Sequence, residues 1–410
     1  MNKSAFYTLF CVIIIDALGM ALPFPVLSAL IVSVHSPLLA TAVSMHAREM
    51  LYSVVMTSFV LGMFIGCPIL GDLSDHIGRK KGIILCLLGV ALGGVISALG
   101  VIIHSASMLI FGRFFSGFAS GSQPIAQAAI IDVSSEADRT INLSRIVLAI
   151  TLGIIVGPII GGLSANAYFS GHFGLSLAFW LSAVFALLNA FAVYKIFQDT
   201  PAKREASPIS FFKSFFSFLA AFKNSSIVFL SLSFLVYEMA WSLYFGGIAL
   251  FLFNVHHYSA MELGLFTSFL GLGASLGMTS GIRVIMHYFK QDKESLVFSL
   301  VIMTILLFCV AVVGSAVAQW ICTFFLGLFV SVAYTNLLSM YSRHASETHQ
   351  GWIMGVATSV GTFAWVVTNS FSGELAFIDL RLPFWLAAFA TIASLLSFWI
   401  YNKRPIEQLK

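Results

Sequence analysis

Long apolar runs separated by short polar segments dominate the chain. A helix that crosses a bilayer needs roughly 20 mostly apolar residues, and the 59% of hydrophobic residues among 410 would fill about twelve such helices. We therefore predict an all-α membrane protein. The expected spans are 5–32, 51–71, 82–103, 107–131, 141–165, 174–198, 226–253, 260–282, 295–316, 318–340, 351–376 and 382–402.

Charge is scarce along the whole chain. Only 9% of the residues are charged, whereas soluble proteins carry about 25%. This composition excludes soluble, secreted and disordered proteins. The net charge of +4 is too small and too scattered to predict a nucleic-acid partner.

The basic residues segregate to one side of the predicted spans. If the N-terminus is cytoplasmic, 18 of the 21 lysines and arginines fall in cytoplasmic segments, and only Arg48, Arg113 and Arg381 lie elsewhere. Lysine and arginine concentrate on the cytoplasmic side of membrane proteins. The pattern favours an even number of spans with both termini cytoplasmic.

One longer cytoplasmic connection, 199–223, separates an N-terminal half, 1–198, from a C-terminal half, 224–410. An aromatic arc at its end, with Lys213 opposite, predicts an interfacial amphipathic helix that ties the halves together. The arc consists of Phe211, Phe212, Phe215, Phe216, Phe218, Leu219 and Phe222. The halves show no convincing internal repeat, although a 6+6 arrangement is typical of transporters with duplicated folds.

The connection between the second and third spans is a tight polar loop with the sequence GDLSDHIGRKK at 71–81. Gly71 lets two backbones approach closely, and Gly78 permits unusual dihedral angles. Asp75 can cap the start of a helix. A turn of this kind needs no further function.

The spacing of this loop closely resembles the G-x-L-a-D-r-x-G-r-K signature of the major facilitator superfamily. Arg79 and Lys80 match its basic end, and His76 replaces a common arginine. RFFSG at 113–117 resembles the R-x-x-q-G signature of the fourth span. GIIVGPIIGG at 153–162 resembles the g-x-x-x-G-P-x-x-G-G signature of proton-driven exporters.

The first span, from Asp16 to Val26, is similar to the D-x-x-G…P-V-L-P start of tetracycline- and multidrug-type antiporters, with Ser28 in place of the final proline. The second half departs from the family pattern, because Arg283 lacks a repeated loop signature around it. The resemblance implies two six-helix halves. It also implies that Asp132 pairs with Arg79 as a conformational latch; a solvated acid at a helix end is the alternative.

Asp16 is the strongest single candidate for a functional residue in the sequence. It lies about ten residues into a span of roughly 25, near the bilayer midplane. A charge there costs roughly 2.5–3.5 kcal/mol, so the group should be neutral or face a cavity. Burial favours the protonated form of a carboxyl and a nearby cation favours the charged form, so such a group is predicted to bind and release a proton. A polar contact between helices is the structural alternative.

Arg113 lies inside the outer end of the fourth span, on a face of small and polar residues that suits a cavity wall. This face contains Gly117, Ser120, Pro124 and Gln127. Span depth separates Arg113 from Asp16 by about 12 Å, so direct pairing is not assured. A packing anchor is the alternative role. Gln123 and Gln127 are candidate substrate contacts.

Glu238 is a second acid at depth, in the seventh span, beside an aromatic wall that suits a flat or cationic molecule. The candidate contacts are Tyr237, Trp241, Tyr244 and, in the eleventh span, Trp365 and Asn369. Simple packing is the alternative, because the chain contains 40 phenylalanines.

Glycines repeat at intervals of four in the fifth span and form one smooth face for close helix packing. The expected conformational residues of this span are Gly153, Gly157, Pro158, Gly161 and Gly162. Pro158 weakens the helix ladder, so these residues permit the bending and sliding that alternating access needs.

The leading hypothesis is a proton-coupled secondary transporter, an antiporter that exports a drug or metabolite by alternating access. Its proton-coupling residues would be Asp16, Arg113 and Glu238. Uptake of a nutrient or a siderophore-type chelate on the same fold is the alternative. A non-transporting membrane sensor is a remote one.

An enzyme is not expected. Five dispersed cysteines predict neither a disulfide nor a metal site, and the ten histidines lie mostly in loops and span ends. No phosphate-binding loop for ATP occurs. We expect no cofactor and no metal. We expect a monomer in a bacterial inner membrane, with a small-molecule substrate, protons and lipid as its partners.

Overall fold

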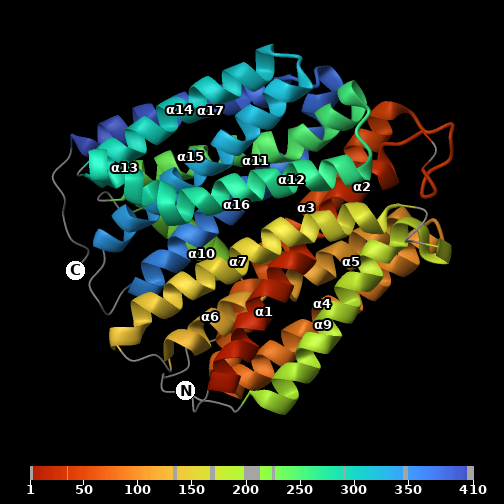
Figure 1. Cartoon of the computed structure of the whole chain (residues 1–410), viewed down its shortest axis with the longest axis horizontal. Helices are drawn as coiled ribbons and strands as arrows, with labels where there is room; N and C mark the ends of the chain where they lie inside the picture. Colours follow the sequence, from red (N-terminus) through yellow and green to blue (C-terminus); the bar gives the residue numbers. More distant parts are fainter. Residues whose placement is uncertain are drawn as a thin grey trace. The chain divides into compact units, whose positions relative to one another are not determined.

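The computed structural model describes residues 3–34, 36–132, 136–166, 171–197, 213–223, 227–289, 291–344 and 350–403. Within these ranges the regular structure is helical, and no strand occurs (Figure 1). The chain divides into two compact units, the first of Met1–Phe211 and His257–Ser268 and the second of Phe212–His256 and Phe269–Lys410. The predicted boundaries at 198 and 224 stay a prediction.

The first unit contains α1 (Lys3–Ala21), α2 (Phe24–Ile31), α3 (Met45–Ile77), α4 (Arg79–Ile102), α5 (Ala106–Phe118), α6 (Ser122–Asp132), α7 (Glu136–Ser164), η1 (Gly171–Ser176), α9 (Leu177–Ile196) and the start of α12 (Ala260–Leu276). The second unit contains α10 (Lys213–Lys223), α11 (Val228–His256), the rest of α12, η2 (Gly277–Gly281), α13 (Ile282–Tyr288), α14 (Asp292–Val312), α15 (Ala316–Arg343), α16 (Gln350–Ile378) and α17 (Leu382–Asn402).

Ten helices in the described ranges are long and apolar enough to cross a membrane. Two predicted spans, 107–131 and 351–376, are not among them. The first breaks at the turn Ala119–Gly121 into the shorter helices α5 and α6. The second lies in α16, whose many glycine, serine and threonine residues lower its hydropathy. The count of twelve and the side of the termini stay predictions.

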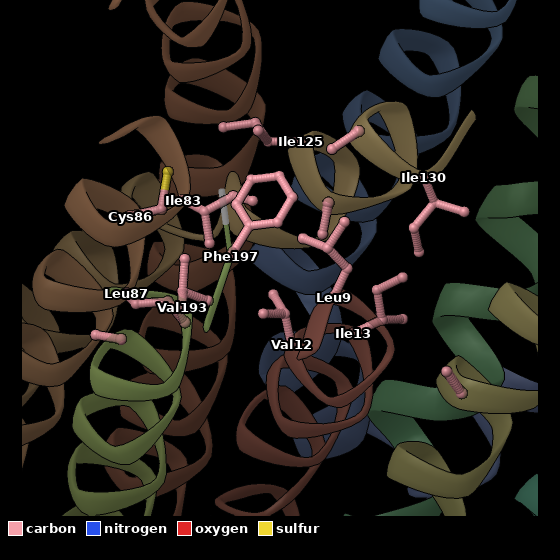
Figure 2. Close-up of a cluster of buried hydrophobic side chains, with 14 of the residues drawn as sticks. Leu9, Val12, Ile13, Ile83, Cys86, Leu87, Ile125, Ile130, Val193 and Phe197 are labelled. Atoms are coloured by element: carbon pink, nitrogen blue, oxygen red, sulfur yellow. The ribbon is translucent and has the colours of Figure 1, made fainter. Parts of the chain in front are cut away.

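An apolar cluster fills the space where α1, α4, α6 and α9 meet in the first unit (Figure 2). Val12 and Ile13 from α1 and Ile83 from α4 have no exposed surface. Ile125 from α6 and Val193 from α9 complete its centre. Burial of each such side chain contributes about 1.5–3 kcal/mol, so this cluster fixes the helices that carry the polar residues described below.

Backbones approach closely between α7 and α1. A Cβ atom added at Gly153, Gly157 or Gly161 would collide with α1 or the residue that follows it. The carbonyl groups that they face belong to Ile14, Leu18 and Leu22, which are also four residues apart. The smooth glycine face predicted from the sequence is therefore present. It holds α7 against the helix that carries Asp16.

The connection between α2 and α3 folds around the side chain of Arg48, which is 1% exposed. Its Nη1 donates to the carbonyls of Ile31 at 3.3 Å and Ser33 at 2.6 Å. Its Nη2 donates to Ala40 at 2.8 Å, and its Nε donates to Val43 at 3.1 Å. Four hydrogen bonds to carbonyls compensate the buried guanidinium and order this connection.

The predicted linker helix is present as α10, and residues 211 and 212 lie outside the described ranges. The ring of Phe218 lies 4.1 Å from that of Phe363 in α16, measured between ring centroids. One side of α10 therefore packs on α16 within the second unit, while Phe216 is exposed.

Candidate functional site

A cavity of about 50 Å³ lies inside the first unit, between α1, α3, α4, α5, α6 and α9. Its polar lining comes from Asp16, Arg113, Ser116, Ser120, Gln123 and Ser182. A water molecule needs roughly 10–15 Å³ of such space, so the cavity has room for a few waters. The structure thus brings Asp16 and Arg113 to one cavity, although their depths in the sequence left this open.

Arg113 reaches the cavity from α5. Its guanidinium carbon lies 4.2 Å from the centroid of the Phe59 ring, and the residue is only 6% exposed. The face of an aromatic ring attracts a cation and stabilises it away from water. Its Nε atom has no hydrogen-bond partner in the described part of the chain. The guanidinium therefore has a donor left for an anionic or polar group.

Asp16 reaches the cavity from α1 and is partly buried. Its Oδ2 atom has no hydrogen-bond partner among the residues described. The residues one turn earlier, Val12 and Ile13, belong to the apolar cluster of Figure 2. Asp16 thus lies at the boundary between a polar cavity and a dry layer.

The two glutamines differ in position. Gln123 lines the cavity, and Gln127, one turn farther along α6, is not part of its lining. Ser182 of α9 and Phe59 of α3 line the cavity and were missed in the sequence. A serine or a phenylalanine in an apolar span carries no signal of its own, because such residues are common in packed membrane helices.

In the second unit, Glu238 of α11 is joined to Trp365 of α16. The indole Nε1 of Trp365 donates a hydrogen bond of 2.9 Å to Glu238 Oε2. The ring of Phe245 lies near those of Trp365 and Trp241 in a tilted orientation, with distances between ring centroids of 5.6 and 5.9 Å. The predicted acid and part of its aromatic wall are therefore side by side. Glu238 is 6% exposed.

The two predicted tyrosines use their hydroxyl groups inside the second unit. Tyr237 donates a 2.7 Å hydrogen bond to the carbonyl of Val330, and the hydroxyl of Tyr244 lies 2.5 Å from that of Thr323. Both side chains are buried. These contacts favour the packing interpretation of the two tyrosines. Asn369 donates to the Trp365 carbonyl at 2.9 Å, and its Oδ1 has no partner in the described ranges.

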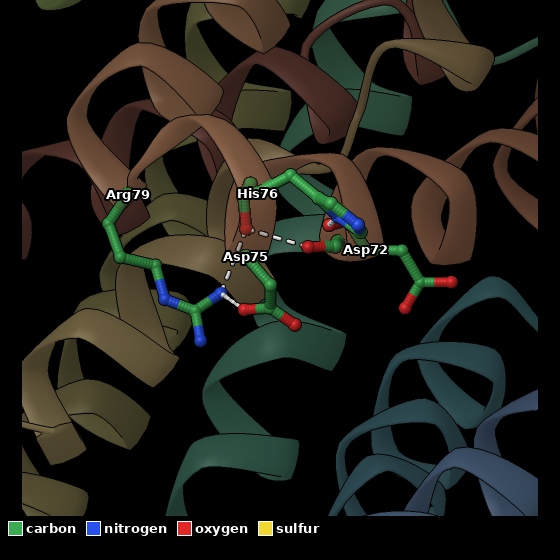
Figure 3. Close-up of polar contacts among 6 residues, drawn as sticks. Asp72, Asp75, His76 and Arg79 are labelled. Carbon is green, nitrogen blue, oxygen red and sulfur yellow. Dashed lines mark hydrogen bonds and ion pairs between the residues drawn. The ribbon is translucent and has the colours of Figure 1, made fainter. Parts of the chain in front are cut away.

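The loop at 71–81 is a helix junction stabilised by an ion pair (Figure 3). Arg79 Nη1 lies 2.7 Å from Asp75 Oδ1 and donates to the Ser74 hydroxyl at 2.8 Å. Gly78 has φ of 94°, a conformation that favours glycine, as predicted. The predicted cap was wrong. Asp75 lies in the last turn of α3, and Gly78 occupies the cap position of α4.

The other residues of this predicted latch are partly described. Lys80 lies with its Nζ 5.6 Å from the centroid of the Tyr194 ring. Among the described residues, a Cβ added at Gly71 would meet no atom within 4 Å, so the close approach predicted there is not present in this part of the chain. Asp132 ends α6, but its side chain lies outside the described part, so the predicted pair with Arg79 stays a prediction.

Pro158 and Gly162 of α7 face the start of α12 within the first unit. A Cβ at Gly162 would meet the Ala260 carbonyl at 2.8 Å. The hydroxyl of Ser268 donates to the Ile155 carbonyl at 2.6 Å. α7 therefore packs on α1 with one side and on the start of α12 with another.

The sequence did not predict the ion pair between α14 and α15. Arg343, at the end of α15, pairs with Asp292, at the start of α14, and Ser339 donates to the same carboxylate at 2.8 Å. Their positions in neighbouring predicted loops gave no sign of this pairing, because loop charges were assigned to topology alone.

Comparison with known proteins identifies the family. The sequence profile of the Major Facilitator Superfamily matches residues 9–368. Multidrug resistance protein 2 of Bacillus subtilis (strain 168) is 24% identical over 405 residues, which is 96% of this chain and 94% of that protein. Tetracycline resistance protein, class D, of Salmonella ordonez is 31% identical over 216 residues, 52% of this chain and 51% of that protein.

The chain therefore spans about half the length of this tetracycline resistance relative. Among solved structures, a D-xylose-proton symporter shares the fold, with a TM-score of 0.73 and 15% identity, over 99% of this chain and 100% of that one. Ten apolar helices and this fold describe a multi-pass membrane protein. The chain belongs to the Major Facilitator Superfamily of membrane transporters.

Proposed function

We propose that the protein is a proton-coupled antiporter that exports a small organic molecule, a drug or a metabolite, from a bacterial cell through the inner membrane. The observation that carries the proposal is the shared cavity of Asp16 and Arg113. The names of the Bacillus and Salmonella relatives, multidrug and tetracycline resistance proteins, support export.

The cavity suits reversible proton binding. A buried carboxyl holds a proton when no cation is near, and a nearby guanidinium favours its release. Both residues line the cavity, and within the described residues neither Arg113 Nε nor Asp16 Oδ2 has a hydrogen-bond partner. A change in their separation would therefore change whether Asp16 holds a proton. The apolar cluster beside Val12 excludes water, so this proton exchanges with the cavity.

Glu238 and Trp365 would supply the second part of the mechanism. A carboxylate beside indole and phenyl rings suits a flat organic cation, which stacks on the rings and is attracted by the charge. Entry of such a cation would compete with the hydrogen bond between Trp365 and Glu238. We assign substrate contact to this pair together with Trp241 and Asn369 of the second unit.

The arrangement in the membrane follows from the charges. We propose twelve spans, with both termini cytoplasmic and two six-helix halves joined by the connection 199–223. The glycines of α7 and the junction at Gly78 would allow the helices to change their packing during alternating access. Neither a cofactor nor a metal is part of this mechanism, and a monomer suffices for it.

Transport in proteoliposomes with an imposed pH gradient tests the proposal, with ethidium and tetracycline as probes. In Asp16→Asn the gradient should no longer drive transport, while binding of the probe persists. Glu262→Gln is the matched control, because Glu262 is an acid that accepts a hydrogen bond from the Ser259 backbone outside the cavity. Undiminished gradient-driven flux in Asp16→Asn would refute the assignment of the proton to Asp16.

A further inference from the structure

The ends of α4 and α9 form a surface to which the proposed transport mechanism assigns no contact with substrate or proton. The two helices pack side by side in the first unit (Figure 1). Small residues bring them together, since a Cβ at Gly94 would lie 3.1 Å from the Phe179 carbonyl oxygen and equally close to Ala183. This close packing leaves the larger side chains of both helices on the outside.

Two lysines flank one tyrosine ring at the end of this pair, where α4 begins and α9 ends. Lys80 Nζ lies 5.6 Å and Lys195 Nζ lies 5.8 Å from the centroid of the Tyr194 ring. Lys195 also lies 5.8 Å from the centroid of Phe191. Tyr194 is 62% exposed and Phe191 is 61% exposed. Both ammonium groups therefore lie beside one exposed aromatic ring, which attracts cations.

Both helices also carry exposed leucines, which we call the leucine strip. Leu85, Leu88 and Leu92 of α4 are exposed at helical spacing, and Leu187 and Leu188 of α9 are exposed as well. In a membrane protein such a strip faces hydrocarbon chains, and aromatic and basic side chains at helix ends lie at the level of the headgroups. The cluster therefore combines a doubly positive end with an apolar track.

We propose that Lys80, Tyr194 and Lys195 form a binding site for an anionic phospholipid. The two ammonium groups hold the phosphate, the phenol ring lies against the glycerol region, and the acyl chains follow the leucine strip. A zwitterionic lipid lacks the net charge that attracts two lysines. This lipid site goes beyond the transport function, and the proposal does not depend on which substrate the protein carries.

The test measures lipid binding directly. Native mass spectrometry of the purified full chain counts bound phosphatidylglycerol and phosphatidylcholine after titration with mixed micelles. The wild type should retain phosphatidylglycerol preferentially. Lys195→Gln should weaken this retention about fivefold, since one lysine near a membrane surface contributes about that factor. Lys80→Gln with Lys195→Gln should weaken it further, and the double arginine variant should restore it.

Lys403→Gln is the matched control, because Lys403 Nζ lies over a single ring, Trp399, at 3.4 Å from its centroid. It should leave the preference within twofold of the wild type. Glycerol phosphate without acyl chains should not compete; full competition would identify a site for free phosphate and overturn the proposal. Unchanged preference in the double glutamine variant would also overturn it, and the melting temperature of that variant shows whether it is folded.

Discussion

Two helices in each unit pack through glycines that are four residues apart, and each glycine faces a carbonyl group of the neighbouring helix. The glycine–carbonyl pairs are Gly62–Phe114 and Gly66–Phe118 in the first unit and Gly273–Phe324 and Gly277–Leu328 in the second. The offset is 211 residues along one helix (273 − 62 and 277 − 66) and 210 along the other (324 − 114 and 328 − 118). The same contact is therefore built twice.

The two units carry different side chains at equivalent positions beside this shared contact. By the offset of 210, Arg113 of the first unit corresponds to Thr323 of the second. Arg113 lies over the Phe59 ring and lines a cavity, whereas Thr323 is buried and hydrogen-bonded to Tyr244. The comparison teaches that close helix packing fixes the residue type only at positions that must hold a glycine. One unit can therefore carry a charged residue where the other carries a neutral hydrogen-bonding residue.

The largest expected effect comes from giving the first unit the residue of the second. Arg113→Thr removes the guanidinium that lines the same cavity as Asp16, and a hydrogen bond to a charged group contributes about 1.5–3 kcal/mol. Gradient-driven transport of ethidium in proteoliposomes should fall by up to about a hundredfold. Thr323→Val should stay within about twofold. Equal losses in the two variants would show that the units do not differ in this way.

The next effect concerns the contact that the units share. Gly66→Leu and Gly277→Leu each place a side chain into a facing carbonyl, and overpacking of this kind costs about 1–3 kcal/mol. The melting temperature in detergent should fall in both variants. Gly71→Leu and Gly355→Leu are matched controls, because a Cβ there meets no atom of the described residues within 4 Å. A drop in only one unit would break the equivalence.

A smaller effect separates the acids of the two units. Trp365→Phe removes the donor to Glu238 but keeps an aromatic ring. Hydrogen bonds to charged groups contribute about 1.5–3 kcal/mol, and the cation competes with this one, so equilibrium binding of ethidium should strengthen about tenfold, with a neutral dye less affected. Glu238→Gln should instead weaken binding of the cation more than binding of the neutral dye. Equal losses for both dyes would indicate a packing role.

The smallest effect is expected at the neutral pair of the second unit. Tyr244→Phe removes its hydrogen bond with Thr323, and such a bond contributes about 0.5–1.5 kcal/mol. The melting temperature should fall slightly, while the transport rate under a pH gradient stays unchanged. A transport defect without a stability defect would give Tyr244 the substrate role predicted from the sequence.

The sequence predicted the fold class well, because apolar runs and the loop motif are local signals. It did not reveal the repeat between the units, since only glycine spacing is shared and the side chains around Arg113 and Thr323 have diverged. The candidate acids were identified because a charge at membrane depth is rare. Their surroundings were not, because Ser182 and Phe59 come from other helices and look ordinary in the sequence.

The hydrogen bonds around Arg48 have a practical consequence. The connection between α2 and α3 contains three serines and several other small residues, and it would be a natural place to insert an epitope tag or a fluorescent protein. Its backbone carbonyls at Ile31, Ser33, Ala40 and Val43 are used by one buried side chain. An insertion between 33 and 43 would therefore separate the acceptors of a single guanidinium, and a tag for detection or purification belongs elsewhere.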